Sequence, residues 1–190
     1  VGVNDTHLTD VNRFDAIVSI VHEPLLRYLA RRAQHDAVDD LYVEVLTVLW
    51  RRMAAVPVGA EVPWALAVAR RTLANQRRAH GRVARLIAKL ALLSPGIDPG
   101  PEPSGLDDGV DAAMRQLRDS DREILRLFAW EQLSTGEIAA VLGISSNAAG
   151  VRLHRAKERF RRVLEEGRSK DATDRGQEVS AERKEARDER

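Results

Sequence analysis

Residues 133–164 read LSTGEIAAVLGISSNAAGVRLHRAKERFRRVL, which is the pattern of two helices joined by a tight turn. Ser134 and Glu137 have the spacing of a capping box, in which the serine hydroxyl and the glutamate carboxylate satisfy backbone amides of the first turn. Gly143 supplies the left-handed residue that commonly ends such a helix. The stretch therefore predicts a helix-turn-helix.

Ser145 or Ser146 is expected to cap the second helix of this stretch. Its apolar residues recur at steps of four and three and are predicted to face inward: Ala149, Leu153, Ala156, Phe160 and Val163. A basic stripe runs beside them: Arg152, Arg155, Arg159 and Arg162. Guanidinium groups placed in this way can meet phosphates or base edges in a major groove, so DNA is the first expected partner. The alternative is an amphipathic helical hairpin in an ordinary core, with arginines that are only solvated.

The composition limits the classes of protein that fit. The chain has 190 residues, and 30 basic and 29 acidic side chains leave a net charge of +1, so any affinity for nucleic acid must come from local clusters. The absence of cysteine excludes disulfides, thiolate metal sites and cysteine nucleophiles. No apolar run is long enough to span a bilayer and the start of the chain lacks a signal-peptide pattern, so we expect a cytoplasmic protein without membrane insertion.

Residues 12–93 show helical periodicity almost throughout, which predicts a first lobe built only of helices. Three helices are expected, over residues 12–34, about 36–53 and about 63–92. The inward side is predicted to carry Phe14, Ile17, Val21, Leu25, Tyr28 and Leu29 in the first helix, and Leu66, Ala69, Leu73, Val83 and Ile87 in the third. Residues 1–11 are expected to form an N-terminal extension.

Residues 94–109 are rich in proline, glycine and aspartate and predict a flexible linker. Residues 110–166 then form a second lobe, in which two short helices precede the helix-turn-helix. The core candidates in these two helices are Leu117, Ile124, Leu125, Leu127 and Phe128. Residues 167–190 carry mixed charges and almost no large apolar side chain, so a disordered tail is expected. The fold class predicted is all-α, with two small helical domains joined by a linker.

Two helices of the first lobe carry functional patterns on their polar sides. The third presents one basic face: Arg71, Asn75, Arg78, Arg82 and Arg85. This face either contacts an anionic polymer or is a solvated arginine face. The second carries a mixed face away from its apolar side: Asp40, Val43, Glu44, Thr47, Trp50 and Arg51. An apolar pair with a charged rim is typical of a protein-docking surface. The pattern fits equally well a central helix of the bundle that is buried on two sides.

Nothing in the sequence indicates catalysis. The sequence has no glycine-rich loop that could bind phosphates. Its five histidines do not have the spacing of metal ligands: His7, His22, His35, His80 and His154. Asp39 and Asp40 are adjacent on a helix and point in different directions, which makes a poor acid–base pair. We therefore expect no enzyme activity, no metal site and no cofactor.

The order of these parts resembles bacterial RNA polymerase sigma factors of the extracytoplasmic-function group, in the sigma-70 family. The resemblance covers residues 14–166 and rests on DDLYVEVLTVLWRR (39–52), WALAVARRTLANQRR (64–78), LRDSDREILRLFAWEQLSTGEIAAVLGIS (117–145) and RLHRAK (152–157). It implies that the first lobe is sigma region 2 and the second is region 4. It also implies a subunit that binds core RNA polymerase, recognises promoter DNA, helps melt it and is regulated by an anti-sigma factor.

The resemblance assigns roles in the first lobe. It implies that the second helix docks on core polymerase through Asp40, Leu41, Val43, Glu44, Thr47, Trp50 and Arg51, with Val43 in a position where the family usually has glutamine. It implies that the third helix reads the minus-ten element through Arg70, Arg71, Asn75, Arg78 and Arg82. The loop 55–61 stands where the family captures a flipped-out base, although it lacks an aromatic platform.

In the second lobe the resemblance implies a minus-35 reader formed by Ser145, Ser146, Asn147, Ala148, Val151, Arg152, His154, Arg155 and Arg159. Residues 148–151 depart from the family pattern and lack its usual lysine, so base contacts are expected from Arg152 and Arg155. Two other functions are weighed against this one: a conventional helix-turn-helix repressor or activator, and a protein-binding adaptor derived from the sigma fold.

Overall fold

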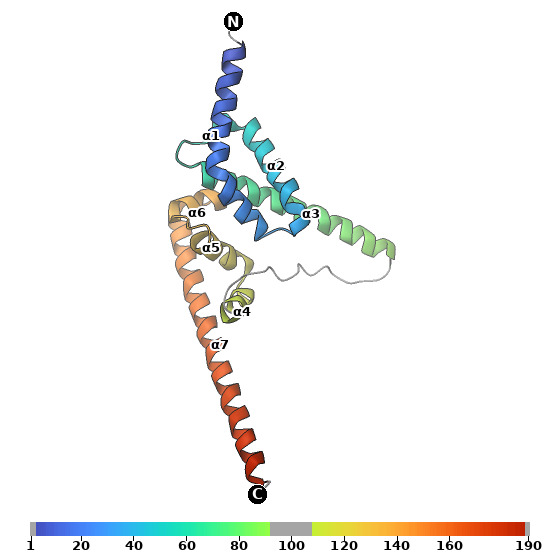
Figure 1. Ribbon diagram of the computed structural model, residues 1–190, viewed down its shortest axis with the longest axis vertical. Helices are drawn as coiled ribbons and strands as arrows, with labels where there is room; N and C mark the ends of the chain where they lie inside the picture. The colour runs from blue at the N-terminus through green and yellow to red at the C-terminus, as the bar shows by residue number, and fades with distance from the viewer. Residues whose placement is uncertain (1–2, 92–107, 189–190) are drawn as a thin grey trace. The chain divides into compact units, whose positions relative to one another are not determined.

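The structure is a computed structural model that describes residues 3–91 and 108–188, with side chains described for residues 9–82 and 109–169. Within these ranges every regular element is a helix, which confirms the all-α prediction (Figure 1). Residues 92–107 lie outside the described residues, and with them most of the predicted linker, residues 94–107.

The first three long helices are α1 (Val3–Ala30), α2 (Val38–Arg51) and α3 (Glu61–Ala91), with short 3-10 turns over His35–Ala37 and Met53–Ala55. Two boundaries of α1 differ from those predicted. The predicted N-terminal extension belongs to α1 from Val3 onward, because no proline or glycine stands between that residue and Asn12 to interrupt the helix. The helix ends at Ala30, four residues before the predicted end.

The remaining helices are α4 (Asp108–Gln116), α5 (Asp119–Ala129), α6 (Thr135–Leu142) and α7 (Ser146–Asp188). The last two residues of the predicted linker therefore begin α4. Residues 167–188, part of the tail expected to be disordered, have helical backbone that continues α7 to Asp188. A lack of large apolar residues does not prevent a helix: this segment contains no proline and is rich in Ala, Glu, Lys and Arg, which favour helical backbone.

Two compact units divide the chain. One consists of residues 1–103 and 133–146, and the other of residues 104–132 and 147–190. The sequence pattern assigned the α6 segment to the second lobe, whereas in this division it belongs with α1, α2 and α3, because α6 contacts α3.

The core of the first unit forms where α1 and α2 pack against each other and against α3. The largest fully buried side chains there are Val21, Leu25, Tyr28, Leu29, Val45, Leu49 and Leu66. The inward side predicted for α1 is thus confirmed. At the end of α1, the Arg32 guanidinium lies 3.8 Å from the centre of the Tyr28 ring, and Arg77 donates a hydrogen bond to the Arg32 carbonyl over 3.0 Å. These contacts fix the turn after α1 against α3.

In the second unit, α4 and α5 are joined by a tightly bonded turn. The Arg122 guanidinium donates hydrogen bonds to the carbonyls of Met114 and Leu117, both over 2.9 Å. Leu117, Ile124, Leu125 and Leu127 are buried as predicted. Phe128, also predicted to be in the core, is exposed, and Lys157 of α7 lies 3.5 Å from the centre of its ring. A cation over the ring face allows an aromatic side chain to remain at the surface.

Candidate nucleic-acid interface

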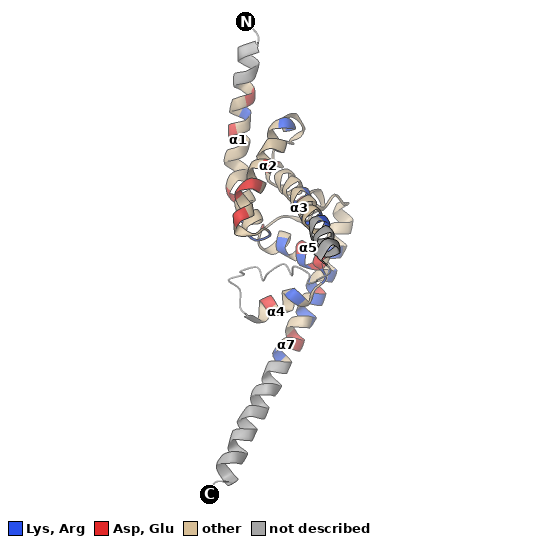
Figure 2. Cartoon of the chain, turned by 90° about the vertical axis from the view of Figure 1, so that its right-hand side faces the viewer, with Lys and Arg blue, Asp and Glu red and all other residues tan. Residues whose placement is uncertain are grey.

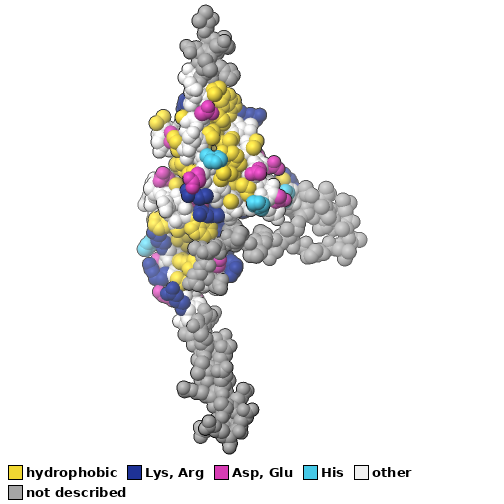
Figure 3. All heavy atoms as spheres, viewed as in Figure 1, with side chains coloured by type: hydrophobic (Ala, Val, Ile, Leu, Met, Phe, Trp, Pro, Cys, Tyr) yellow, Lys and Arg dark blue, Asp and Glu magenta, His cyan; other side chains and the backbone are white. Residues whose placement is uncertain are grey.

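The outer side of α2 combines apolar and charged side chains that are open to solvent. Val43 is 61% exposed and Trp50 is 40% exposed. The charged and polar residues around them are also exposed: Asp40, Glu44, Thr47 and Arg51. The helix is therefore buried on one side only, and Figure 3 shows apolar and acidic side chains together over α1 and α2. We call this set of six residues the α2 face.

Two details define the α2 face. The Trp50 ring packs edge-to-face on Phe14 of α1, with ring centres 5.0 Å apart, which holds the indole in one orientation. Leu41, which was predicted to belong to the polymerase-binding set, is only 2% exposed. Its side chain lies with Val45 and Leu49 on the buried side of α2, beneath the α2 face.

Tyr42 ties α2 to α1. Its hydroxyl lies 2.7 Å from Nδ1 of His22, and the two rings meet edge-to-face. Burial raises the pKa of the Tyr42 hydroxyl above its usual range. The hydroxyl stays protonated at neutral pH and shares one hydrogen bond with Nδ1 of His22.

The polar side of α3 is basic, as the sequence predicted. All five residues assigned to minus-ten binding are exposed: Arg70, Arg71, Asn75, Arg78 and Arg82. On the opposite side Leu66, Ala69 and Leu73 are buried. The Arg85, Val83 and Ile87 side chains lie outside the described residues. Figure 2 shows basic residues, in blue, along both α3 and α7.

We call these five exposed residues of α3 the α3 row. Within it, Arg78 is held by contacts to its own helix. Its Nη2 donates to the Asn75 side-chain oxygen over 2.7 Å, and its Nε donates to the Ala74 carbonyl over 3.2 Å. Both contacts lie on the exposed surface, so they orient the guanidinium without burying it. The contact to Asn75 uses its amide oxygen and leaves the NH₂ group able to donate to another acceptor.

The loop before α3 is anchored at both ends and exposed in the middle. Val56 is buried, and its carbonyl accepts a hydrogen bond from Arg13 of α1 over 3.4 Å. Gly59 has φ +80° and donates its N–H to the Glu61 carboxylate over 3.0 Å. Val58 lies between these anchors and is almost fully exposed. The loop therefore has a defined shape with an apolar tip.

The capping box at the start of α6 is confirmed. The Glu137 amide donates to the Ser134 hydroxyl over 3.3 Å, and the Ser134 amide donates to the Glu137 carboxylate over 2.8 Å. Gly143 ends the helix with φ 67° and ψ 40°, the left-handed conformation that was predicted. Helix α7 begins three residues later, so Ser145 immediately precedes its first residue.

The first turns of α7 present most of the residues assigned to minus-35 binding. Seven of them are exposed: Ser145, Ser146, Asn147, Val151, Arg152, His154 and Arg155. Ala148 is half-buried. On the inward side Ala149, Leu153 and Ala156 are buried, and Phe160 and Val163 are half-buried. The predicted separation of an apolar side from a basic side is confirmed.

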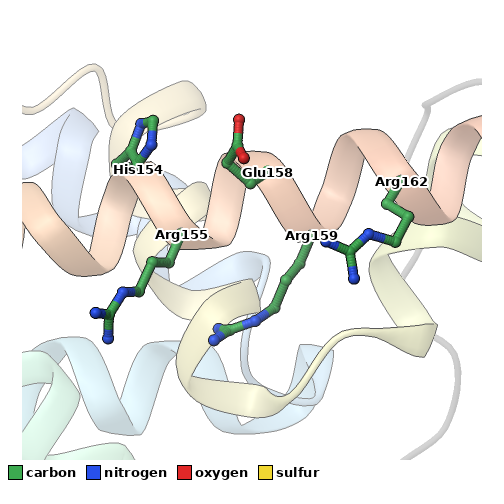
Figure 4. A pocket seen from close by; sticks show the side chains of 5 residues that line it. All are labelled: His154, Arg155, Glu158, Arg159 and Arg162. Atoms are coloured by element: carbon green, nitrogen blue, oxygen red, sulfur yellow. The ribbon is translucent and has the colours of Figure 1, made fainter.

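Arg159 differs from the other arginines of α7. Its Nη1 atom lies 2.7 Å from the Asp121 carboxylate of α5. Figure 4 shows Arg155 and Arg159 extending from the same side of α7, whereas Glu158 points the other way. His154, Arg155, Glu158, Arg159 and Arg162 line a shallow, open hollow on this helix. One of the residues assigned to DNA binding is therefore held by the protein itself.

Sequence reasoning missed Arg13 and Asp121. Arg13 bonds a carbonyl 43 residues away, and Asp121 pairs with an arginine 38 residues away. No local pattern reports contacts of this length, because they depend on how the helices pack.

Two further expectations concern absent features. Among the residues that the structure describes, no group of three or more His, Cys, Asp or Glu side chains could hold a metal ion. Over the same part of the chain, no helix is both long enough and apolar enough to cross a membrane.

Comparisons with known proteins identify the family of this chain. Residues 108–160 match the model of sigma-70, region 4. The chain is 31% identical over 160 residues to an RNA polymerase sigma-E factor of Streptomyces avermitilis, covering 82% of this chain and 87% of that protein. It is 32% identical over 154 residues to the RNA polymerase sigma factor CarQ of Myxococcus xanthus, covering 76% of this chain and 86% of that protein.

Solved structures have the same fold. The sigma factor RpoE from Bartonella quintana, determined in complex with the anti-sigma factor NepR, matches with a TM-score of 0.52 and 20% identity, covering 86% of this chain and 98% of that one. CnrH, determined in complex with the cytosolic domain of CnrY, matches with a TM-score of 0.53 and 20% identity, covering 80% of this chain and 87% of that one. The chain belongs to the sigma-70 family of bacterial RNA polymerase sigma factors, in its extracytoplasmic-function group.

Proposed function

We propose that this sigma factor binds core RNA polymerase through the α2 face and reads two promoter elements, the minus-ten through α3 and the minus-35 through the start of α7. The observation that carries this proposal is the exposed basic side of α7 directly after an intact capping box and a left-handed glycine turn. A helix introduced in this way is suited to the major groove.

The α2 face supports docking on a protein rather than on DNA. Its centre is apolar, with Val43 and Trp50 exposed, and its rim is of mixed charge. Aromatic residues that are pre-oriented in the free protein lose little conformational entropy on binding, as expected for the Trp50 ring packed on Phe14. Acidic residues at the rim would repel a DNA backbone and attract a basic partner.

The α3 row and the loop before it support promoter melting. Exposed arginines meet phosphates, and the Asn75 amide can read a base edge. Strand opening costs unstacking energy, which a pocket for an extruded base offsets. We assign base capture to the loop around Gly59, which directly precedes α3 and exposes Val58 as an apolar surface at its tip.

At α7 we assign base reading to Arg152 and Arg155. Both are exposed and stand one turn apart, whereas the residues before them are short. Two arginines can each form bidentate hydrogen bonds to guanine, the most frequent specific contact in the major groove. The minus-35 preference of this protein should then differ from that of relatives with longer side chains in the first turn.

The proposal includes partners and setting. An anti-sigma protein that covers the α2 face or the DNA-binding rows would regulate such a factor. Among solved structures of the same fold, the sigma factor RpoE is bound to the anti-sigma factor NepR and CnrH is bound to the cytosolic domain of CnrY. We infer that the protein acts in the cytoplasm, where polymerase and promoters are, and that it supplies specificity without catalysing a reaction of its own.

Transcription in vitro tests the function. Core RNA polymerase, with and without this protein, is given a library of GC-rich genomic fragments, and RNA 5′ ends are mapped. We expect discrete new start sites that share two upstream elements at fixed spacing. If folded protein yields no new starts while another initiation factor activates the same core polymerase, the proposal is contradicted.

A further inference from the structure

Asp121 is a buried charged residue near the start of α5. Only 10% of its side chain is exposed, and its carboxylate accepts a hydrogen bond from Arg159 of α7 over 2.7 Å. The Arg159 side chain is 43% exposed, so the carboxylate of this ion pair is nearly buried while the guanidinium borders solvent. The pair joins the helix that carries the minus-35 residues to the helix beneath it.

The buried charge of Asp121 favours the orientation of Arg159 toward it. A carboxylate that loses its water needs a charged or hydrogen-bonding partner, because an unpaired buried charge is strongly destabilising. The partner that the structure supplies is Arg159, one turn beyond Arg155 on the same side of α7 (Figure 4). Extending Arg159 toward a DNA phosphate would therefore compete with its contact to Asp121.

The start of α5 is itself a fixed platform. The Asp121 amide donates to the Arg118 carbonyl over 2.9 Å. The neighbouring Arg122 binds the last carbonyls of α4 and also pairs with Asp119 over 3.3 Å. Because these bonds hold the backbone on both sides of Asp121, its carboxylate is a rigid point to which α7 is tied.

We propose that Asp121 is a positioning residue for minus-35 recognition, acting through Arg159, and that Arg159 does not contact DNA. The inference rests on the proposed function of α7. The ion pair sets the angle and rotation of α7 on α5, and this orientation decides whether Arg152 and Arg155 meet base edges. A small misplacement of the helix then weakens reading of the sequence while general attraction to phosphates remains.

A double-mutant cycle tests the coupling. Asp121→Asn, Arg159→Met and the double variant are assembled with core polymerase, and promoter binding is compared on templates with an intact or a scrambled minus-35 element. We expect the ratio between the two templates to fall about tenfold in each single variant and no further in the double variant, because both changes break one contact. Additive losses, or an unchanged ratio, would overturn the proposal.

The salt dependence of promoter binding separates positioning from phosphate contact. Each phosphate contact that is lost lowers the slope of log K against log salt by about 0.9. We expect Arg159→Met to leave this slope unchanged and Arg71→Met, a control on α3 at an exposed arginine that we assign to a phosphate, to lower it by about one contact. A slope lowered equally by Arg159→Met would mean that Arg159 binds DNA directly.

Two controls keep the test decisive. Arg159→Lys retains the charge and should restore most of the minus-35 discrimination, whereas a direct bidentate role for the guanidinium predicts no rescue. The neutral double variant leaves no unpaired charge, so it folds even where Arg159→Met alone does not. If the wild-type complex itself shows no preference for the intact element, the proposed function of α7 fails, a result distinct from failure of the positioning role.

Discussion

Helices α3 and α7 both present a row of arginines from an exposed side, and both follow a left-handed glycine, yet their arginines are held differently. In α3 the basic residues stay at the surface, and the contact recorded for Arg78 is to its own helix. In α7 the row is interrupted, because Arg159 is bound to Asp121 of another helix. A regular basic stripe in a sequence therefore does not show which of its members are available to a ligand.

The largest effect is expected at the α2 face, because promoter recognition by both α3 and α7 depends on binding to core polymerase. Glu44→Arg together with Trp50→Ala reverses a rim charge and removes the apolar anchor of the α2 face. Affinity for core polymerase should fall at least about 100-fold, since truncated aromatic anchors and reversed charges each cost about 2 kcal/mol or more. Binding of labelled protein to core polymerase, by fluorescence anisotropy, measures the loss.

If α3 and α7 depend on this common anchor, recognition of both promoter elements disappears together in that variant. Glu23→Arg, the same charge change at an exposed position of α1, is the control and should bind polymerase normally. Loss of the folded state together with polymerase binding would show that Trp50 serves the core through its contact with Phe14.

A more selective loss is expected at α7. Arg152→Ala or Arg155→Ala should cost about 1–3 kcal/mol of discrimination at one base pair of the minus-35 element and leave the minus-ten preference intact. Selection of promoters from a randomised library by the reconstituted holoenzyme measures the preference at each position. Unchanged selectivity in both variants would contradict the assignment of these arginines to base reading.

At α3 the expected loss is smaller and less specific. Arg71→Ala or Arg82→Ala removes an exposed guanidinium that we assign to phosphates. Promoter binding should weaken uniformly across sequences, and its salt slope should fall by about one contact. Asn75→Ala is the contrasting variant, because losing an amide that reads a base changes sequence preference and not the salt slope. A shift of sequence preference in Arg71→Ala would instead place that arginine at a base.

The local features of both helices could be predicted from sequence, because they depend on neighbours within one or two turns. The Ser134–Glu137 capping box, the Gly143 turn and the buried side of α3 are all found as predicted. The exposure of Val43 and Trp50 resolved an alternative that helical periodicity alone left open. Periodicity reports which residues share a side, and only packing shows how many sides are covered.

The departures from the sequence pattern have the same origin. Leu41 matches a family motif for docking, and its side chain is buried on the apolar side of α2 that includes Val45. Phe128 had core spacing, and a cation from α7 covers it at the surface. The partnership of Asp121 with Arg159 spans 38 residues and could not be read from any window of the sequence. Each case depends on a contact between helices that the sequence does not specify locally.

The smallest expected effect compares the two glycines that introduce these helices. Gly59 (φ +80°) and Gly143 (φ +67°) have open space where a Cβ would be placed, so strain in the backbone is the main cost of alanine at either position. Gly59→Ala and Gly143→Ala should each lower the free energy of unfolding by about 1 kcal/mol, with asparagine costing less than alanine because it tolerates the left-handed region. Urea denaturation followed by circular dichroism measures both.

Function should separate the two glycine variants although their stability costs are equal. Gly143→Ala alters the turn that leads into α7 and should weaken discrimination of the minus-35 element. Gly59→Ala alters the loop before α3 and should slow strand opening, which permanganate reactivity of unpaired thymines in the minus-ten element reports. If both variants impaired both elements equally, the effect would be one of general stability, and the assignment of α3 and α7 to separate promoter elements would lose this support.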